Sequence, residues 1–306
     1  SAIRVHPPHC ALRNWKILNA TFEGVIVAAF GRHYEIELPD HRSITGYPLG
    51  KKSTYACGDR VALESASADQ AQIIRHLPRT SLLYRSDAYR QKLIVANATQ
   101  LVLVVATEPS FSDDLLTRAL VAAETEAIRS IIVLNKTDLD MHLPGARQRL
   151  APLAALGYQV IELSARNDAT PLLPFLAGEL SVLVGQSGMG KSTLINALVP
   201  GATAATREIS DALDSGKHTT THARMYPLEH GGNLIDSPGL QEFGLAHLTR
   251  GAIEQGFVEF RPFLAHCRFR DCCHQSEPGC AIKEAVAAES IDRRRYELFL
   301  RIGRQK

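Results

Sequence analysis

The chain has 306 residues, of which 34 are basic and 32 acidic, and 45% of the residues are hydrophobic. This length predicts two or three domains with ordinary packed cores, and the net charge of +2 gives no reason to expect general binding to nucleic acids or membranes. Apolar stretches such as residues 101–106 are far shorter than the ~20 residues that span a bilayer, and the sequence does not begin with a signal-peptide core. We therefore expect a soluble, cytoplasmic protein.

Residues 1–20 show little periodicity and are expected to form a mobile arm, whereas residues 21–78 predict a five-stranded barrel of the OB type. Short β-rich runs alternate there with turn signals, at residues 24–30, 33–38, 42–47, 60–64 and 70–76. OB barrels often bind nucleic acids through one face and its loops. The side chains that could serve this purpose are Arg32, His33, Tyr34, Arg42, Lys51 and Lys52. Each of them taken singly fits an ordinary solvated surface equally well.

Residues 79–244 predict an α/β domain. After a polar connector that contains Arg79, Arg85 and Arg90, apolar strands alternate with amphipathic helices, which is typical of a parallel sheet covered on both faces. We expect strands at residues 101–106, 131–134, 160–163, 180–184, 223–228 and 233–235, and helices near residues 113–128, 146–156 and 191–198. From residue 245 to residue 306 the chain becomes helical with short loops, which predicts a separate C-terminal domain.

A glycine-rich stretch between a predicted strand and a predicted helix matches the phosphate-loop pattern G-x4-G-K-[ST]. Its glycines allow the backbone to fold around phosphate so that successive N–H groups point at the anion. Lys191 is expected to reach the outer phosphates and Ser192 to bind Mg²⁺. The alternative is a glycine-rich turn without a ligand. The expected nucleotide contacts in this stretch are Gly185, Gln186, Ser187, Gly188, Met189, Gly190, Lys191, Ser192 and Thr193.

The sequence Asn135-Lys136-Thr137-Asp138 follows another predicted strand and matches N-K-x-D. Asp138 can accept hydrogen bonds from the N1–H and the exocyclic amino group of guanine, a pair of donors that adenine lacks, so this residue favours GTP over ATP. We expect Asn135 to tie this loop to the phosphate loop and Lys136 to lie along the base. Ser164 and Ala165 would complete the base site through a backbone N–H. By itself, N-K-x-D also fits a helix-capping turn.

The sequence Asp236-Ser237-Pro238-Gly239 matches D-x-x-G. In this motif we expect Asp236 to hold Mg²⁺ through water and the Gly239 N–H to meet the γ-phosphate. Residues 216–221, Gly-Lys-His-Thr-Thr-Thr, are suited to a mobile switch, and one of these threonines should reach Mg²⁺. We favour Thr220 over the threonines on either side, although the run itself leaves the register open.

The order of these motifs differs from that of an ordinary GTPase, which runs from the phosphate loop through the switch threonine and D-x-x-G to N-K-x-D and S-A. Here N-K-x-D and S-A come first, so we predict a circularly permuted domain. Permutation is feasible because domain termini lie at the surface and are often close together. As a result, the segment after Gly239, which senses the γ-phosphate, leads directly into the C-terminal domain. Loss of phosphate could therefore reach that domain as an order-to-disorder change.

The C-terminal domain contains four cysteines and a histidine between residues 267 and 280, and three of the cysteines together with the histidine follow C-x4-C-x-H-x5-C spacing. Three thiolates and an imidazole suit tetrahedral Zn²⁺ with no open position, which would make the metal structural. Buried free thiols are the alternative. Residues 293–306 carry six basic residues and one acidic residue. This local charge suits RNA phosphate, although a solvated helix face explains it equally well.

The permuted motif order, the G-x-H-T-T-T segment and the cysteine pattern together resemble the circularly permuted, ribosome small-subunit-dependent GTPases known as the RsgA or YjeQ family. The resemblance covers nearly the whole chain after about residue 20. It implies an N-terminal OB domain, a central GTPase domain and a C-terminal helical zinc domain, which act in late maturation of the small ribosomal subunit.

The resemblance also implies roles for individual residues. The zinc ligands would be Cys267, Cys272, His274 and Cys280, with Cys273 a bystander unless it replaces its neighbour. Leu240 stands where many GTPases place a water-orienting glutamine, and leucine cannot position water. The family places a catalytic histidine before the threonine run, so His218 is the candidate for this role. The alternative is a solvated loop histidine.

We therefore expect a GTP hydrolase, stimulated by the small ribosomal subunit, whose flanking domains bind 16S rRNA and release it according to nucleotide state. The chain would act as a monomer with one structural Zn²⁺ and with Mg²⁺ bound alongside GTP. Leu240 keeps an alternative open, an RNA-interaction module that uses GTP as a switch with negligible hydrolysis. The barrel, the zinc region and the absence of a membrane segment disfavour a third possibility, a GTPase that acts at membranes or in transport.

Overall fold

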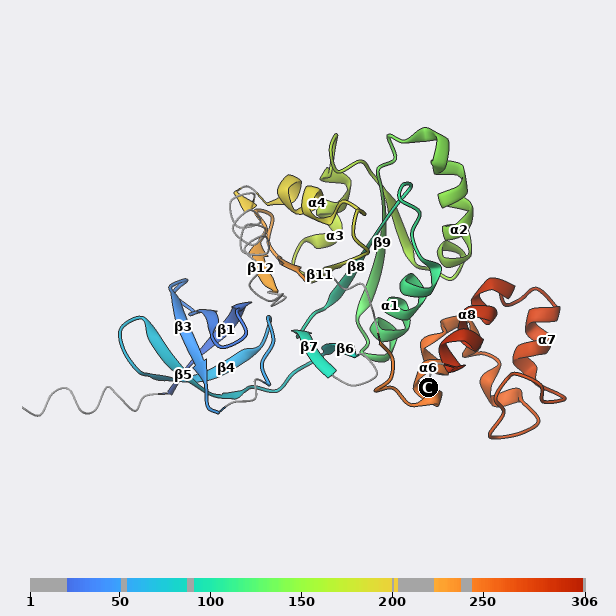
Figure 1. The fold of residues 1–306 in the computed structure, drawn as a ribbon, viewed down its shortest axis with the longest axis horizontal. Helices are drawn as coiled ribbons and strands as arrows, with labels where there is room; N and C mark the ends of the chain where they lie inside the picture. The colour runs from blue at the N-terminus through green and yellow to red at the C-terminus, as the bar shows by residue number, and fades with distance from the viewer. Residues whose placement is uncertain are drawn as a thin grey trace, which may run out of the picture.

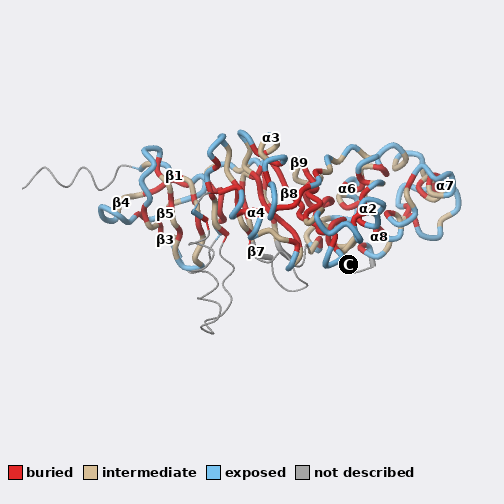
Figure 2. Tube along the Cα trace, turned by 90° about the horizontal axis from the view of Figure 1, so that it is seen from above, coloured by how far each residue is buried: buried red, intermediate tan, exposed pale blue. Residues whose placement is uncertain are grey.

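The computed structural model describes residues 21–50, 54–86, 91–199, 201–202, 223–237 and 244–304. Three parts follow one another along the long axis of the molecule: a small barrel, a central sheet with its helices, and a helical C-terminal region (Figure 1). Buried residues gather densely along the strands of the central sheet (Figure 2). No helix in the described ranges is long and apolar enough to cross a membrane.

The N-terminal barrel closes around five strands: β1 (Thr21–Ala29), β2 (Tyr34–Glu37), β3 (Ser43–Pro48), β4 (Arg60–Ser65) and β5 (Gln70–His76). β1 pairs with both β2 and β4, and the parallel pair of β3 with β5 completes the ring. Alternate residues point inward, as the period of two along a strand requires, and they form a small separate core around Ile26, Tyr34 and Ile36. The prediction of a five-stranded barrel is confirmed.

The central sheet contains parallel strands in the order β10 (Gln159–Glu162), β9 (Arg129–Asn135), β8 (Gln100–Ala106), β11 (Leu180–Val184) and β13 (Asn233–Asp236). β8 is buried along its whole length, as expected for a parallel strand covered on both faces. The helices are α1 (Asp113–Thr125), α2 (Leu143–Ala155), α3 (Leu173–Leu176) and α4 (Lys191–Leu198), with the 3₁₀ turns η1 (Asp140–His142) and η2 (Thr170–Leu172). The predicted α/β architecture is confirmed.

Two features of the central part differ from the prediction. The expected polar connector contains a hairpin of β6 (Leu82–Ser86) and β7 (Gln91–Ala96). Leu83 and Val95 of this hairpin are buried in the main core, and the neighbouring arginines conceal this in the sequence. In addition, β12 (Arg224–Pro227) runs antiparallel to β13, because the turn at residues 228–232 is too short for a parallel crossover.

Strand pairing joins the barrel to the central sheet. β1 pairs with β12 through Ala28 and Arg224, which produces one continuous sheet of eleven strands. Arg224 also forms an ion pair with Glu35 of the barrel. Where the chain leaves the barrel, the guanidinium of Arg79 donates two hydrogen bonds of 2.7 Å to the fully buried carboxylate of Asp59.

The C-terminal region packs against the central part through α1. It consists of α6 (Arg250–Gly256), α7 (Ala281–Ala287) and α8 (Arg293–Arg304), with the 3₁₀ turns η3 (Val258–Phe260) and η4 (Leu264–His266). α6 and α8 contact α1, and the rings of Phe257, Phe260 and Phe299 pack on one another. These residues belong to the same hydrophobic core as the central sheet.

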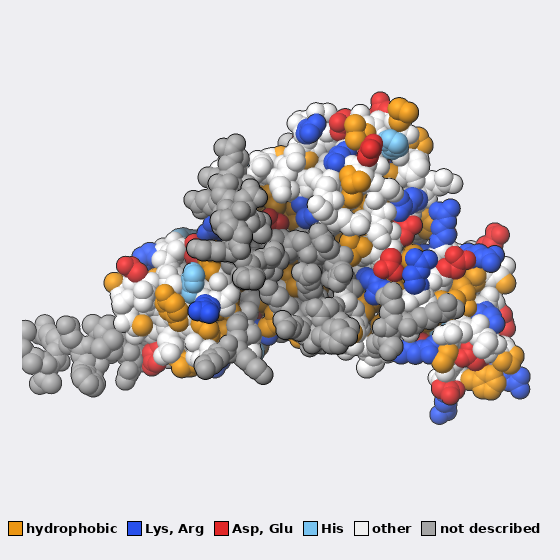
Figure 3. All heavy atoms as spheres, viewed as in Figure 1, with side chains coloured by type: hydrophobic (Ala, Val, Ile, Leu, Met, Phe, Trp, Pro, Cys, Tyr) orange, Lys and Arg blue, Asp and Glu red, His pale blue; other side chains and the backbone are white. Residues whose placement is uncertain are grey.

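The basic residues of α8 do not all face solvent. Arg295 is only 4% exposed, and its guanidinium donates to Glu259 Oε1 at 2.7 Å and to Thr117 Oγ1 at 3.1 Å. Arg293 forms an ion pair with Glu297. Acidic side chains also lie among the basic ones over this region on the face shown in Figure 3. Arg295 therefore serves the fold, and the exposed basic face is smaller than the local charge predicts.

Candidate functional site

A pocket of about 470 Å³ lies at the carboxyl ends of the parallel strands, the edge at which open α/β sheets bind ligands. Three predicted motifs meet there: the phosphate loop after β11, N-K-x-D after β9 and S-A after β10. The residues that line the pocket are Asn135, Lys136, Asp138, Leu139, Ser164, Ala165, Arg166, Ser187, Gly188, Gly190, Lys191, Ser192 and Thr193.

The phosphate loop depends on glycine for its backbone conformation and for close approach. Gly188 and Gly190 have φ angles of +80° and +91°, a region that glycine enters without the steric cost of a Cβ atom. A Cβ atom on Gly190 would collide with the side-chain nitrogen of Asn135. α4 begins directly afterwards at Lys191, so the first-turn N–H groups, which have no partner within a helix, belong to the pocket wall.

Lys191 and Asp236 form the charged part of the site. The ammonium group of Lys191 donates to the carbonyl oxygens of Gly185 at 2.6 Å and Gln186 at 2.8 Å. Burial lowers the pKa of Lys191, and the nearby Asp236 opposes this shift. Burial likewise raises the pKa of Asp236, and Lys191 opposes that shift. Each charge therefore lies in a partly dry environment, where electrostatic attraction to a counter-charge is strong.

Asn135 connects all three loops of the pocket. Its Nδ2 atom donates to the Met189 carbonyl of the phosphate loop at 2.9 Å. Its Oδ1 atom accepts from the N–H of Lys136 at 2.8 Å and from the N–H of Ala165 at 2.9 Å. The side chain is 2% exposed, so these are interior hydrogen bonds. The predicted link from N-K-x-D to the phosphate loop is present, and it extends to the S-A loop.

Asp138 and Ser164 lie on the side of the pocket that is predicted to hold the base. A hydrogen bond from the Ser164 side chain lowers the pKa of Asp138, which keeps the carboxylate ionised and able to accept hydrogen bonds. Leu139 and Arg166 also line the pocket and were not predicted. Each directly follows a predicted motif residue, and this adjacency is the signal that could have identified them.

Other predicted site residues do not line the pocket. Gln186 directs its side-chain oxygen toward α1, where it accepts from the Ser112 N–H at 2.7 Å. Met189 is buried beneath the loop. Asp236 ends β13 and interacts with Lys191 without lining the described pocket. Gly185 does not line the pocket either, although its carbonyl accepts from Lys191. His218, Thr220 and Gly239 lie outside the described residues, as does Leu240.

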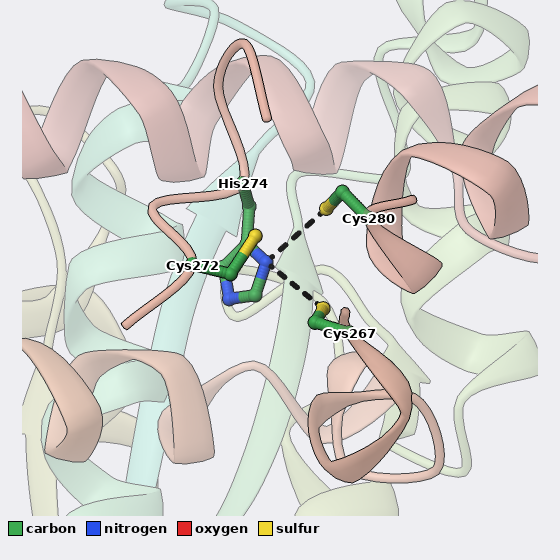
Figure 4. A group of neighbouring side chains, drawn as sticks. All are labelled: Cys267, Cys272, His274 and Cys280. Atoms are coloured by element: carbon green, nitrogen blue, oxygen red, sulfur yellow. Dashed lines mark hydrogen bonds between the residues drawn. The ribbon is translucent and has the colours of Figure 1, made fainter. Parts of the chain in front are cut away.

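The four predicted metal ligands come together in the C-terminal region (Figure 4). The sulfur atoms of Cys267, Cys272 and Cys280 and a ring nitrogen of His274 all lie within 4.8 Å of one another. The His274 Nδ1 atom is 3.6 Å from Cys267 Sγ and 3.3 Å from Cys280 Sγ. Of these ligands, Cys272, His274 and Cys280 are buried.

This donor set fits a tetrahedral zinc ion. Zn–S bonds of about 2.3 Å and Zn–N bonds of about 2.0 Å place neighbouring ligand atoms about 3.5 Å apart, close to the separations around His274 Nδ1. Three thiolates and one imidazole would leave no position for water, which is typical of structural zinc. The other ring nitrogen of His274 lies 3.6 Å from Glu254 Oε1, a carboxylate that can fix the orientation of the ring.

Cys273 lies beside the cluster but outside it. Its thiol donates to the carbonyl of Asp271 and contacts Arg250. The carboxylate of Glu277 holds this loop by accepting hydrogen bonds from the backbone N–H groups of Cys273, Gln275 and Ser276. The N–H of Glu277 itself and these neighbouring N–H groups lower the pKa of the Glu277 carboxyl group to about 2. Neither Glu254 nor Glu277 was predicted from the sequence as a support for the metal loop.

A comparison with protein-family models matches residues 76–246 to the model described as RsgA GTPase. The matched range is more than half of the chain, and it includes all the nucleotide motifs. The chain belongs to the RsgA GTPase family. The resemblance inferred from the permuted motif order is therefore confirmed.

Curated RsgA proteins are similar to this chain over most of their length. A protein named small ribosomal subunit biogenesis GTPase RsgA from Burkholderia pseudomallei is 57% identical over 285 residues, which cover 92% of this chain and 91% of that protein. A protein of the same name from Paraburkholderia xenovorans is 54% identical over 289 residues, with 91% and 92% covered. Another from Nitrosospira multiformis is 52% identical over 283 residues, with 92% and 90% covered.

Two solved structures are similar to this chain over most of its length. YjeQ from Thermotoga maritima matches with a TM-score of 0.72 and 28% identity, covering 92% of this chain and 97% of that one. YloQ, described as a circularly permuted GTPase, matches with a TM-score of 0.69 and 25% identity, covering 97% and 99%. The predicted circular permutation is confirmed.

Proposed function

We propose that this chain hydrolyses GTP during late maturation of the small ribosomal subunit, where its flanking domains bind 16S rRNA and release it according to the bound nucleotide. The observation that carries the proposal is that Asn135 joins the phosphate loop, the N-K-x-D loop and the S-A loop around one pocket. The names of its curated relatives also support it. We further propose that the protein acts as a monomer in the cytoplasm, with domains at residues 21–78, 79–244 and 245–306.

In this proposal the phosphate loop and α4 bind the phosphates. When nucleotide binds, the ammonium group of Lys191 gives up its hydrogen bonds to the carbonyls of Gly185 and Gln186 and donates to outer phosphate oxygens. Ser192, Thr220 and Asp236 would hold Mg²⁺, which would neutralise negative charge on the phosphates. Burial that raises the pKa of Asp236 makes this carboxylate a strong partner for a cation, because the cation offsets the cost of a buried negative charge.

The base loops select guanine. Asp138 accepts from the N1–H and the exocyclic amino group, and Lys136 lies along the base. A backbone N–H of the loop that holds Ser164 and Ala165 meets the guanine oxygen. The lowered pKa of Asp138 supports this assignment, since a protonated carboxyl group could not accept both hydrogen bonds.

The hydrolytic step needs a group that orients water, and Leu240 cannot supply it. We propose His218 for this role, because imidazole can orient water or accept its proton near neutral pH. His218→Ala should lower turnover stimulated by the small subunit while GTP affinity stays nearly unchanged. An equal loss of both would contradict the assignment.

The flanking parts offer exposed aromatic and basic side chains for RNA. On the barrel, the rings of Phe30 and His33 stack at 5.0 Å, and Tyr47, 44% exposed, lies 6.3 Å from His33. In the C-terminal region, Phe269 is 41% exposed between two exposed arginines. Exposed rings with nearby guanidinium groups suit stacking on unpaired bases.

The deciding experiment measures GTP turnover with and without purified small ribosomal subunits, together with binding to the subunit in the presence of GDP or a non-hydrolysable GTP analogue. We expect turnover to rise with the subunit and binding to differ between nucleotides. Nucleotide-dependent binding without turnover would favour the switch module that Leu240 keeps open. The absence of both effects would reject the proposal.

A further inference from the structure

Residues 107–112, Thr-Glu-Pro-Ser-Phe-Ser, connect β8 to α1 between the phosphate loop and the N-K-x-D loop. They match none of the nucleotide-binding motifs. β8 lies between β9 and β11 in the sheet, so its carboxyl end opens between the two loops that hold the base and the phosphates. The segment is therefore placed to contact both.

The contacts on the base side converge on Lys136. This residue has a φ angle of +62°, a left-handed conformation that is costly for a side chain with a Cβ atom and persists only where the surroundings enforce it. The Thr107 hydroxyl donates to the Lys136 carbonyl at 2.9 Å, and the Lys136 ammonium donates to the Glu108 carbonyl at 2.7 Å. The segment thus holds Lys136 at both its backbone and its side chain.

The contacts on the phosphate side involve the other end of the segment. The Ser112 N–H donates to the Gln186 side-chain oxygen at 2.7 Å. A Cβ atom added to Gly188 would lie 3.2 Å from Pro109, so the loop and the segment are close-packed. Arg149 of α2 also holds the segment, since its guanidinium donates to Ser110 Oγ at 2.7 Å and to the Phe111 carbonyl at 2.6 Å.

The left-handed turn at Lys136 determines where Asp138 points, because it sets the direction of the chain two residues earlier. Thr107 is 7% exposed, so its hydroxyl acts in a protected setting where a lost hydrogen bond is costly. The Lys136 carbonyl accepts only one other hydrogen bond from the described residues, from the Leu139 N–H at 3.0 Å. Removal of the Thr107 hydroxyl would leave the turn with weaker support.

We propose that Thr107 is a positioning residue for guanine recognition: it holds Lys136 in the left-handed conformation that aims Asp138 at the base. This inference rests on the proposed role of Asp138. It adds a residue from outside the motifs to the determinants of base selectivity.

The test compares the affinities of GDP and inosine diphosphate, measured by titration calorimetry on the full chain. Inosine lacks the exocyclic amino group, so it has less to lose when Asp138 is misaligned. For Thr107→Val we expect GDP affinity to fall about tenfold and the preference for GDP over inosine diphosphate to shrink. Thr107→Ser, which keeps the hydroxyl, should retain both values within about twofold.

Thr125→Val is the matched control, because the Thr125 hydroxyl also donates to a backbone carbonyl at 2.9 Å, that of Ala122 in α1, without lining the pocket. It should leave both affinities unchanged. If Thr107→Val does not fold, Thr107→Ala removes the same hydroxyl. An unchanged preference in these variants, or equal losses for both nucleotides, would overturn the inference. A wild-type protein with no preference for GDP would instead reject the proposed function.

Discussion

Replacement of Asn135 by alanine tests whether the three loops form one nucleotide site. The side chain makes three interior hydrogen bonds, to Met189, Lys136 and Ala165. At about 1 kcal/mol net for each hydrogen bond, their loss amounts to about 3 kcal/mol, and unpaired buried groups add to this cost. If the pocket must restore this geometry in order to bind, GDP affinity should fall by roughly a hundredfold.

Gln100→Ala is a stringent control for this experiment. Gln100 is also a buried amide with three hydrogen bonds, to Phe175, Ser181 and Arg129, but it lies at the amino end of β8, away from the pocket. Both variants should melt at lower temperature, measured by circular dichroism, whereas only Asn135→Ala should lose GDP affinity in calorimetry. Equal GDP affinities in the two variants would refute the reasoning.

Three further substitutions test the buried ion pair of α8, the zinc site and the proposed Mg²⁺ site. Arg295→Met should destabilise the protein by about 3–5 kcal/mol because it leaves Glu259 buried and unpaired, and adding Glu259→Leu should recover most of this loss in chemical denaturation. Cys272→Ser should abolish the binding of one zinc per chain, measured by metal analysis, whereas Cys273→Ser should retain it. Asp236→Asn should raise the melting temperature without nucleotide and abolish Mg²⁺-dependent GTP binding. Because the pKa of Asp236 is raised by burial, this stability advantage should shrink as the pH falls and the wild-type carboxyl takes up a proton.

Most of the fold could be predicted because its periodicities are strong. Parallel strands covered on both faces are continuous apolar runs, and β11 and α4, which flank the glycine-rich loop, have the bounds predicted for them. The barrel strands follow from alternation between turn signals. The β6–β7 hairpin was missed because its strands are short and its arginines resemble a connector, while its burial depends on contacts with the distant core.

The motifs identified the residues of the pocket but not their supports. Asn135, Asp138 and Lys191 belong to patterns that specify a chemistry, so their types and spacing are informative. Thr107, Glu254 and Glu277 act through contacts with distant or irregular backbone. No period or spacing in the sequence indicates such contacts. The burial of Arg295 was hidden for the same reason, since its partner Glu259 lies on another element.

The two flanking domains are attached to the nucleotide domain by different physical means. The C-terminal region shares the hydrophobic core of the central sheet, with Phe257, Phe260 and Phe299 in that core. The barrel has its own core and contributes Cys57 to the main core. It is joined to the central part at two places. At β12 the Ala29 N–H donates to the Ala223 carbonyl at 3.2 Å and Arg224 pairs with Glu35, and beside β7 the Ala96 N–H donates to the Cys57 carbonyl at 2.9 Å.

This difference decides which flank is easier to displace. A shared apolar core resists displacement because separation exposes its surface to water, whereas a partly exposed ion pair contributes at most about 1 kcal/mol. Arg224 also lies opposite Asp236 in the β12–β13 pair. Of the described barrel residues, only Cys57 belongs to the shared core, so separation of the barrel would expose less apolar surface than separation of the C-terminal region. One barrel contact, the β1–β12 pair, lies one strand away from the carboxylate proposed to hold Mg²⁺. The permuted motif order alone predicts that nucleotide state acts on the C-terminal domain. The packing indicates instead that the barrel is the flank that can move at lower energetic cost.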